Sequence, residues 1–173
     1  VDAAVGGKTG INFNGLKNEI GVINPAKTVV ISPDFLRSLD TENLLSGYAE
    51  MLKHGLLSSE EEMKRLSKFD AKNPDFDLLA DLIKTSIEVK ANIVKQDPTE
   101  KGIRKALNLG HTIGHAFESY SHETNRPILH GHAVAWGLIG ELFLSYKLKG
   151  FPQSVMTETV RFIRENYGVF DIT

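Results

Sequence analysis

The sequence predicts a mostly α-helical fold with a short N-terminal α/β remnant. After residue 40, apolar residues recur every three or four positions, which is the spacing of amphipathic helices. Residues 133–148 are apolar almost throughout, and such a helix belongs at the centre of a bundle. Before residue 40, a glycine-rich run and a β-branched run predict a loop and one short strand. We therefore expect an α/β tail over residues 1–39 and a helical domain, incomplete at its C-terminus, over residues 40–173.

Composition narrows the possible functions. The chain has 173 residues with a net charge of -2, so its overall field favours neither nucleic acid nor a membrane surface. It has no cysteine, so a metal site would use histidine, aspartate, glutamate and water. No apolar run approaches the roughly 20 residues of a membrane span. We expect a cytoplasmic protein and, because the chain begins with Val1, a piece of a longer one.

The first 20 residues carry four glycines and two lysines, which suggests a backbone that approaches an anion closely. The run Gly7-Lys8-Thr9 is not a nucleotide-binding P-loop, because Asp2 stands where that motif requires glycine. Residues 28–31 predict a short buried strand that Pro33 ends. Residues 35–38 then form a turn or a short helical piece.

The first long helix is predicted from a cap at Asp40 or Thr41 to about residue 57. Its Glu50, Lys53 and His54 are three and four residues apart and can share one side. Residues 58–75 form a connection or a short surface helix. A second long helix covers about residues 74–95.

Lys90 falls within the apolar stripe of that second long helix. There it must snorkel to solvent, form an ion pair or point into a site. After a turn at residues 96–100 and the segment described next, two more helices follow. They are the apolar helix 133–148, interrupted by Glu141, and an amphipathic helix over residues 153–167.

Between these helices, Arg104, Asn108, His111 and His115 recur at intervals of four, three and four. This spacing predicts one polar face on one helix. Gly110 and Gly114 each lower helix propensity by about 1 kcal/mol relative to alanine, which suggests close approach of a helix or a ligand. The alternative is an ordinary solvated face, but such faces are usually rich in lysine and glutamate.

Glu50, His111 and His130 come from three different predicted helices whose apolar faces share one core. Two histidines and a glutamate with an open position are a common catalytic zinc environment. His111 and His115 could instead both bind a metal, and His130 could be a capping or loop residue. A zinc protease is excluded, because Thr112 stands where that motif has glutamate.

Isolated cations are too numerous for a neutral substrate. They suggest a phosphorylated or carboxylated small molecule. These residues are Lys8, Lys17, Lys53, Lys90 and Arg104.

Four motifs together resemble the 3-dehydroquinate synthases of the shikimate pathway. They appear in the family's order and span residues 2–138. The motifs are residues 5–12 with Lys17 and Asn18, residues 48–53, residues 107–118 and residues 130–137. The resemblance implies a dinucleotide-binding α/β domain followed by a helical metal-binding domain. The chain would hold the end of the first, with residues 1–39, and most of the second.

The resemblance also implies roles for single residues. The metal ligands would be Glu50, His111 and His130. The catalytic and substrate-site residues would be Asp2, Lys53, Lys90, Arg104, Asn108 and His115. The cofactor-binding residues would be Lys8, Lys17, Asn18, Phe35, Leu36, Arg37 and Ser38, with Lys8 and Lys17 also near the substrate phosphate and Asn18 also matching a substrate-site position. His115, one turn after His111, would serve phosphate binding or proton transfer.

The implied enzyme is a phosphate-eliminating lyase. It converts 3-deoxy-D-arabino-heptulosonate 7-phosphate, a phosphorylated sugar acid, to 3-dehydroquinate and phosphate. NAD would be a recycled cofactor and Zn²⁺ or Co²⁺ a Lewis acid. The family commonly forms homodimers, and neither a nucleic acid nor a membrane partner is expected.

Two family features are not found in the sequence, namely the glycine-rich NAD fingerprint and a lysine near the family's C-terminus. We therefore expect the isolated chain to lack synthase activity. Another sugar-phosphate cyclase, of the deoxy-scyllo-inosose or epi-valiolone synthase type, is the nearest alternative. A metal-dependent polyol dehydrogenase fits less well, because it needs no phosphate-binding lysines. A non-catalytic helical metal-binding domain is a further alternative.

Overall fold

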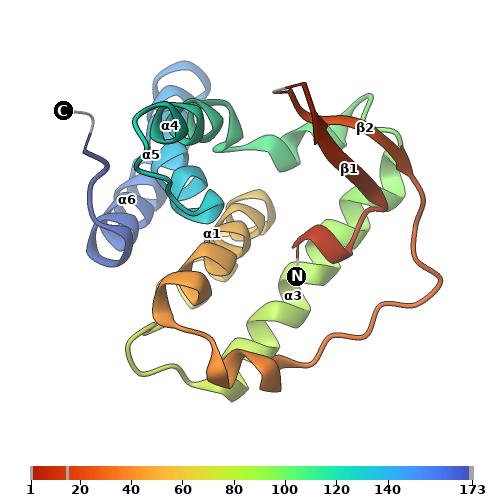
Figure 1. Cartoon of the computed structure of the whole chain (residues 1–173). Coiled ribbons are helices and arrows are strands. Elements are labelled where there is room, and N and C mark those ends of the chain that lie inside the picture. Colours follow the sequence, from red (N-terminus) through yellow and green to blue (C-terminus); the bar gives the residue numbers. More distant parts are fainter. Residues whose placement is uncertain (1, 15, 172–173) are drawn as a thin grey trace.

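The computed structural model describes residues 2–14 and 16–171, without the side chains of residues 12 and 16–18 (Figure 1). The described part is mostly helical and has one two-stranded antiparallel sheet. The helices are α1 (Thr41–Ser58), α2 (Glu60–Leu66), α3 (Phe76–Gln96), α4 (His111–Glu123), α5 (His130–Lys149) and α6 (Gln153–Tyr167). The strands are β1 (Lys8–Phe13) and β2 (Leu16–Ile23), and three 3-10 segments are η1 (Asp2–Ala4), η2 (Pro33–Ser38) and η3 (Ile103–Asn108).

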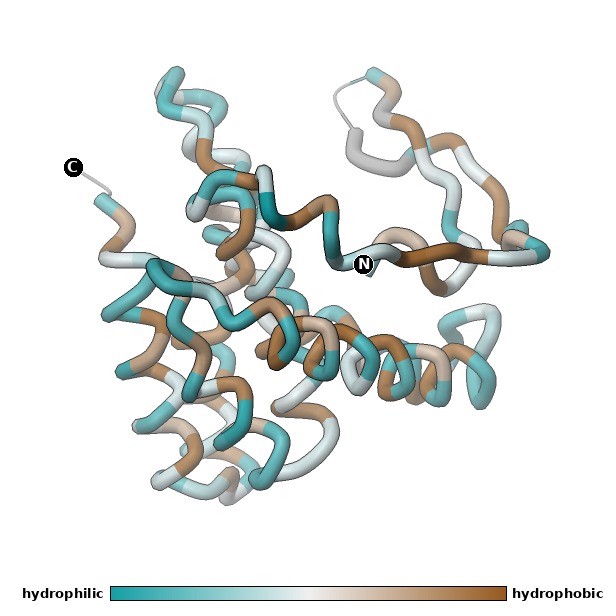
Figure 2. The backbone as a smooth tube through the Cα atoms, turned by 90° about the horizontal axis from the view of Figure 1, so that it is seen from below, coloured by the Kyte–Doolittle hydropathy of each residue, from teal (hydrophilic) through white to brown (hydrophobic). Residues whose placement is uncertain are grey.

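Helix α5 lies at the centre, as its apolar sequence predicts. It packs against α1, α4 and α6, while α1 also contacts α2 and α3. Figure 2 shows the other helices alternating between hydrophilic and hydrophobic positions along their turns. Their apolar sides form one core with residues from α1, α2, α3, α5 and α6. None of the described helices is long and apolar enough to cross a membrane.

Glycines set the distance between α5 and its neighbours. A Cβ atom on Gly137 would lie 2.1 Å from the carbonyl oxygen of Gly110, and one on Gly131 would lie 1.8 Å from that of Ser46. Both distances are far below van der Waals contact, so α4 and α1 approach α5 to backbone contact. The predicted role of Gly110 and Gly114 in close helix packing is therefore confirmed, since a Cβ on Gly114 would also lie 2.9 Å from the carbonyl oxygen of Ala133.

The boundaries of the long helices agree with the prediction. Asp40 is the N-cap of α1, and its carboxylate accepts a hydrogen bond from the Asn43 amide at 2.9 Å. Asp75 caps α3 in the same way. Gly150, in the left-handed conformation with φ 70°, ends α5.

The predictions for the N-terminal region were wrong in two respects. The glycine-rich run forms the hairpin β1–β2, whose Asn14-Gly15 sequence is a typical hairpin turn signal. The predicted buried strand at residues 28–31 is instead irregular chain, in which Val30 is 88% exposed and Ile31 is partly buried against the core. A strand needs a hydrogen-bonding partner, and in the part of the chain that the structure describes only β1 and β2 pair.

The prediction that Arg104, Asn108, His111 and His115 share one helix was also wrong. η3 ends at Asn108, and Gly110 adopts φ 81° before α4 begins at His111. Glu141 of α5 then caps the new helix, because its carboxylate accepts hydrogen bonds from the amides of Gly110 and Thr112 at 2.8 and 3.1 Å. The predicted boundary between an α/β domain (residues 1–39) and a helical domain (residues 40–173) stays a prediction.

Candidate functional site

Glu50, His111 and His130 converge from α1, α4 and α5. One ligand atom of each lies within 4.8 Å of the others. Glu50 Oε1 lies 3.5 Å from His111 Nε2 and 3.4 Å from His130 Nε2. Both histidines are the first residues of their helices, so their positions are set by where α4 and α5 begin. We call these three side chains the Glu-His-His cluster.

The electrostatics of this cluster suit a divalent metal. Burial lowers the pKa of His111 despite the nearby Glu50 carboxylate, so the imidazole is neutral at pH 7. Burial would raise the pKa of Glu50, but contacts that include the Lys53 ammonium group outweigh it and hold that pKa well below its usual range. A neutral imidazole and an ionised carboxylate are the forms that bind zinc.

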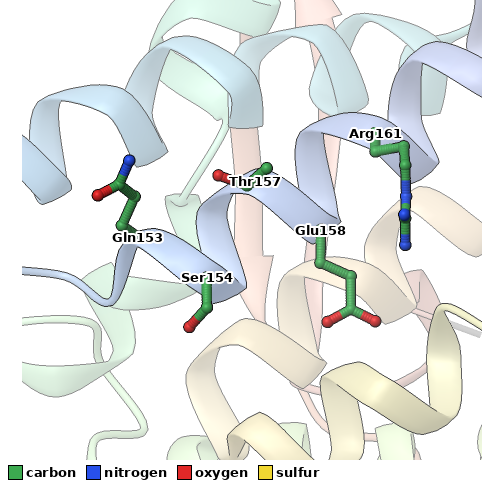
Figure 3. Close-up of a pocket in the computed structure, with 5 residues that line it drawn as sticks. All are labelled: Gln153, Ser154, Thr157, Glu158 and Arg161. Atoms are coloured by element: carbon green, nitrogen blue, oxygen red, sulfur yellow. The ribbon is translucent and has the colours of Figure 1, made fainter.

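A cavity of about 490 Å³ opens beside the cluster. Its lining includes most of the site residues that the sequence predicts. They are Asp2, Lys8, Lys53, Lys90, Arg104, Asn108, His111, His115 and His130. A second cavity of about 590 Å³ runs along one face of α6 and is lined by Gln153, Ser154, Thr157, Glu158 and Arg161 (Figure 3). It contains none of the predicted site residues, so the candidate chemistry lies in the first cavity.

Asp2 gathers the cations on one wall of the cavity. Its Oδ1 lies 2.9 Å from Lys90 Nζ and 3.6 Å from Lys53 Nζ. Lys53 also donates a hydrogen bond to Glu50, and Lys90 donates one to the Asp2 carbonyl. Burial would raise the pKa of Asp2, but His54 and the two ammonium groups outweigh it and hold the pKa well below its usual range. Lys90 therefore pairs rather than snorkels, and burial lowers its pKa.

His54 does not pair with Glu50, although the two are four residues apart. It is 1% exposed, with Nδ1 2.7 Å from Ser86 Oγ and Nε2 3.2 Å from Asp2 Oδ1. His54 thus bridges Ser86 and the Asp2 carboxylate. In the sequence Ser86 is one of several polar residues near the middle of α3, and nothing there distinguishes it from its neighbours.

Arg104 lines the cavity, but two nitrogens of its guanidinium group donate hydrogen bonds to backbone carbonyls of the chain. Nη1 donates to the Pro98 carbonyl at 2.7 Å and Nη2 to the Gly6 carbonyl at 2.8 Å. The side chain is 2% exposed. Arg104 therefore ties the N-terminal segment to the chain that leads into α4.

Glu100 was missed by the sequence reasoning. It lines the cavity, accepts a hydrogen bond from Asn108 Nδ2 at 2.9 Å and forms an ion pair with Lys8. Glu118 and Glu141 were missed as well, and both contact the chain around the histidines. A usable signal existed for each of these two, because Glu118 is three residues after His115 and Glu141 is an isolated acid in an apolar helix.

The predicted cofactor segment lies away from the cavity. Phe35, Leu36, Arg37 and Ser38 belong to η2, and none of them lines the cavity with the histidines. Phe35 is 82% exposed, and the Arg37 guanidinium lies 4.7 Å from the centre of the Phe76 ring. The side chains of Lys17 and Asn18, also predicted to bind the cofactor, lie outside the described residues.

The chain matches two models of one protein family. Residues 1–46 match the 3-dehydroquinate synthase N-terminal model, and residues 47–171 match the C-terminal model. The whole chain is 58% identical to the 3-dehydroquinate synthase of Parabacteroides distasonis and covers 50% of that protein. It is 40% identical to that of Saccharolobus solfataricus, again over the whole chain and 49% of the relative. The chain thus spans about half the length of these curated relatives.

Solved structures show the same fold. The crystal structure of 2-deoxy-scyllo-inosose synthase with carbaglucose-6-phosphate, NAD⁺ and Co²⁺ matches 99% of the chain and 48% of its own length, with a TM-score of 0.83 and 24% identity. The 2-epi-5-epi-valiolone synthase of Streptomyces hygroscopicus, with NAD⁺ and Zn²⁺ bound, matches 96% of the chain and 54% of its own length, with a TM-score of 0.70 and 22% identity. The structural matches show the fold, and the two family models, which together account for residues 1–171, show that the chain belongs to the 3-dehydroquinate synthase family.

Proposed function

We propose that the chain is the metal- and substrate-binding part of a 3-dehydroquinate synthase, a lyase of the shikimate pathway. The whole enzyme would convert 3-deoxy-D-arabino-heptulosonate 7-phosphate to 3-dehydroquinate and phosphate. One observation carries the proposal, namely that the Glu-His-His cluster stands at the edge of a cavity lined by four cationic side chains. The relatives that share 58% and 40% of the sequence bear the same name.

Glu50, His111 and His130 would hold Zn²⁺ or Co²⁺. Two imidazoles and a carboxylate leave a coordination position open, as in catalytic zinc sites. When bound, the ion supplies a Lewis acid for hydroxyl oxygens of the substrate. The bound Co²⁺ and Zn²⁺ in the two related cyclases support this assignment.

The cations of the cavity would bind and orient the substrate. Lys53 and Lys90 are buried and held in place by Asp2, so their ammonium groups are preorganised for the substrate's anionic groups. Lys8, Arg104 and Asn108 also line the cavity and would hold further polar groups of the molecule. His115, whose Nδ1 lies 3.0 Å from Glu118, would serve phosphate binding or proton transfer.

The parts of the proposal that concern NAD rest on residues of the N-terminal region. Lys8, Lys17, Asn18 and the segment from Phe35 to Ser38 would contact the cofactor. Residues 1–39 would then belong to the NAD-binding α/β domain and residues 40–173 to the helical domain. The full-length enzyme would be a cytoplasmic homodimer without nucleic-acid or membrane partners.

A chimera tests the proposed function. This chain would replace the matching half of the Parabacteroides distasonis relative, and phosphate release would be measured with NAD⁺ and Zn²⁺. We expect release from 3-deoxy-D-arabino-heptulosonate 7-phosphate by the chimera, loss of that release in its Glu50→Gln variant, and no release by the isolated chain.

Competing substrates decide between related enzymes. Release from glucose 6-phosphate or sedoheptulose 7-phosphate in place of the heptulosonate ester would assign a different cyclase and overturn the proposal. A folded chimera that is inactive on all three esters but still binds Zn²⁺ would favour a non-catalytic metal-binding domain.

A further inference from the structure

Glu118 of α4 contacts two histidines, His115 and His130, with one carboxylate oxygen. Its Oε2 lies 3.0 Å from His115 Nδ1 and 3.3 Å from His130 Nδ1. The Glu118 side chain is 15% exposed, so solvent competes little for these contacts. No role described above uses this carboxylate.

The two histidines of the Glu-His-His cluster follow one pattern. His111 Nδ1 lies 3.3 Å from the Leu109 carbonyl oxygen, and His130 Nδ1 lies 3.3 Å from Glu118. In both rings Nε2 faces Glu50. A carbonyl and an ionised carboxylate can only accept hydrogen bonds, so each Nδ1 must carry the hydrogen and donate it. In a neutral ring, the lone pair then lies on Nε2, on the side of the candidate metal.

The rings of His115 and His130 lie side by side. Their centroids are 5.7 Å apart and their planes differ by 27°. Because both Nδ1 atoms point at the same Glu118 oxygen, both Nε2 atoms point away from it. Both residues also line the cavity. One carboxylate therefore governs which ring nitrogen each histidine presents to that space.

We propose that Glu118 is a positioning residue that fixes the tautomer of His130 and of His115. It presents His130 Nε2 as a metal ligand and His115 Nε2 as a hydrogen-bond acceptor toward the substrate cavity. The metal part rests on the proposed function, and the tautomer part does not. Carboxylates behind metal-bound histidines typically strengthen metal binding by 10–100-fold.

The same side chains could be taken for a second metal site, since ligand atoms of His115, Glu118 and His130 also lie within 4.8 Å of one another. The distances favour hydrogen bonds. The contacts of Glu118 are 3.0 Å with His115, an ordinary hydrogen-bond length, and 3.3 Å with His130, whereas both contacts of Glu50, at 3.5 Å with His111 and 3.4 Å with His130, are at the upper limit. Glu50 is thus spaced for an ion between the groups, and Glu118 is spaced to accept a hydrogen bond directly from His115.

The test compares Glu118→Gln with the wild-type chain in two measurements. A glutamine that puts its oxygen in the place of Oε2 is neutral and accepts more weakly, and one that puts its NH₂ group there cannot accept, so either orientation weakens the contacts with both imidazoles. We expect the Kd for Zn²⁺ to rise 10–100-fold while the stoichiometry stays at one ion per chain. In the metal-free chain at pH 8, ¹H–¹⁵N correlation of the six histidines should show the Nδ1–H form of His130 and His115 changing to a mixture of tautomers.

Glu123→Gln is the matched control. Glu123 is exposed in the last turn of the same helix, so this substitution removes an equal charge without touching the histidines. It should leave the zinc affinity and the tautomers of His115 and His130 as they are in the wild type. Circular dichroism of both variants checks that α4 remains folded.

Three results would overturn the proposal in distinguishable ways. Wild-type zinc affinity and wild-type tautomers in Glu118→Gln would remove the positioning role and leave the proposed function intact. Loss of all zinc binding in Glu118→Gln, with binding retained in Glu50→Gln, would make Glu118 a ligand. A wild-type chain that binds no Zn²⁺ would overturn the metal part together with the proposed function.

Discussion

The helical wall of the cavity and its N-terminal wall hold their functional groups by different means. On the helical wall, Glu50, His111 and His130 are fixed by the packing of α1, α4 and α5, whose backbones touch at glycines. On the N-terminal wall, η1 and the hairpin contribute few core residues, and the wall is held by charge contacts such as those of Asp2 with Lys53 and Lys90. The comparison predicts that steric substitutions should damage the first wall, and that charge removal and acid should damage the second.

Gly137→Ala should cause the largest loss in the free energy of unfolding, because it disrupts the close packing of the helical wall. The new Cβ atom would lie 2.1 Å from the Gly110 carbonyl oxygen and would push α4, with His111, away from α5. We expect a loss of about 3 kcal/mol in the free energy of unfolding, as for severe overpacking, and weaker zinc binding. Urea denaturation and zinc titration would measure both.

Gly47→Ala is the control for that prediction. Gly47 is exposed in the middle of α1, and its added Cβ would meet nothing within 4 Å. This variant should gain about 0.5–1 kcal/mol from helix propensity and backbone entropy. A Gly137→Ala chain as stable as Gly47→Ala would contradict the packing account of the helical wall.

Asp2→Asn should cause the second-largest loss in the free energy of unfolding, and this loss should depend on pH. The pKa of Asp2 is depressed in the folded chain, so its carboxylate stabilises the fold above the ordinary value of 3.8, and this contribution disappears as the pH falls from there toward the folded pKa. At pH 7 we expect a loss of about 2 kcal/mol, because Lys53 and Lys90 lose a partly buried partner.

The loss caused by Asp2→Asn should shrink below pH 4, because the stabilisation by the Asp2 carboxylate is itself lost there. Urea denaturation from pH 2.5 to 7 would show this. Asp34→Asn is the comparison variant, since Asp34 is 80% exposed and only pairs with Arg37 on the surface. A loss at pH 7 that persists undiminished at pH 2.5 would speak against an electrostatic N-terminal wall.

Glu141→Gln should have the smallest effect of the three damaging changes. Glu141 accepts hydrogen bonds from three amides at the start of α4, and the glutamine keeps only one acceptor oxygen. We expect a loss of about 1 kcal/mol, the usual value of an N-cap, with a few-fold weaker zinc affinity because His111 is the first residue of that helix. Glu165→Gln, exposed on α6, is the control and should change neither quantity.

The helical wall was largely predictable from the sequence, whereas the N-terminal wall was not. Periodicity and caps indicated α1, α3, α5 and α6, because their stability comes from local spacing and a shared apolar core. The break before His111 was missed, since it depends on Glu141, which is 30 residues further along the chain. The hairpin was not predicted, because the glycine-rich run was interpreted as a loop, although the Asn14-Gly15 sequence is typical of a hairpin turn.

The candidate site shows the same limit. Residue types and order were enough to bring Glu50, His111 and His130 into one hypothesis, and the structure brings them together. The partners of these residues were not predictable, because Glu100, Glu118 and Ser86 act through contacts between distant segments. Arg104 was expected to face the substrate, yet its bonds to Gly6 and Pro98 depend on how the N-terminal segment folds back.

The contacts of Asp2 and Gly6 with the helical part have a consequence for exchanging segments between relatives. Residues 1–46 match one family model and residues 47–171 the other, so Asp2 lies in one half and Lys53 and Lys90 lie in the other. Recombination of two relatives between residues 46 and 47 would combine the Asp2 of one parent with the Lys53 and Lys90 of the other. Functional recombinants should therefore take Asp2, Lys53 and Lys90 from the same parent.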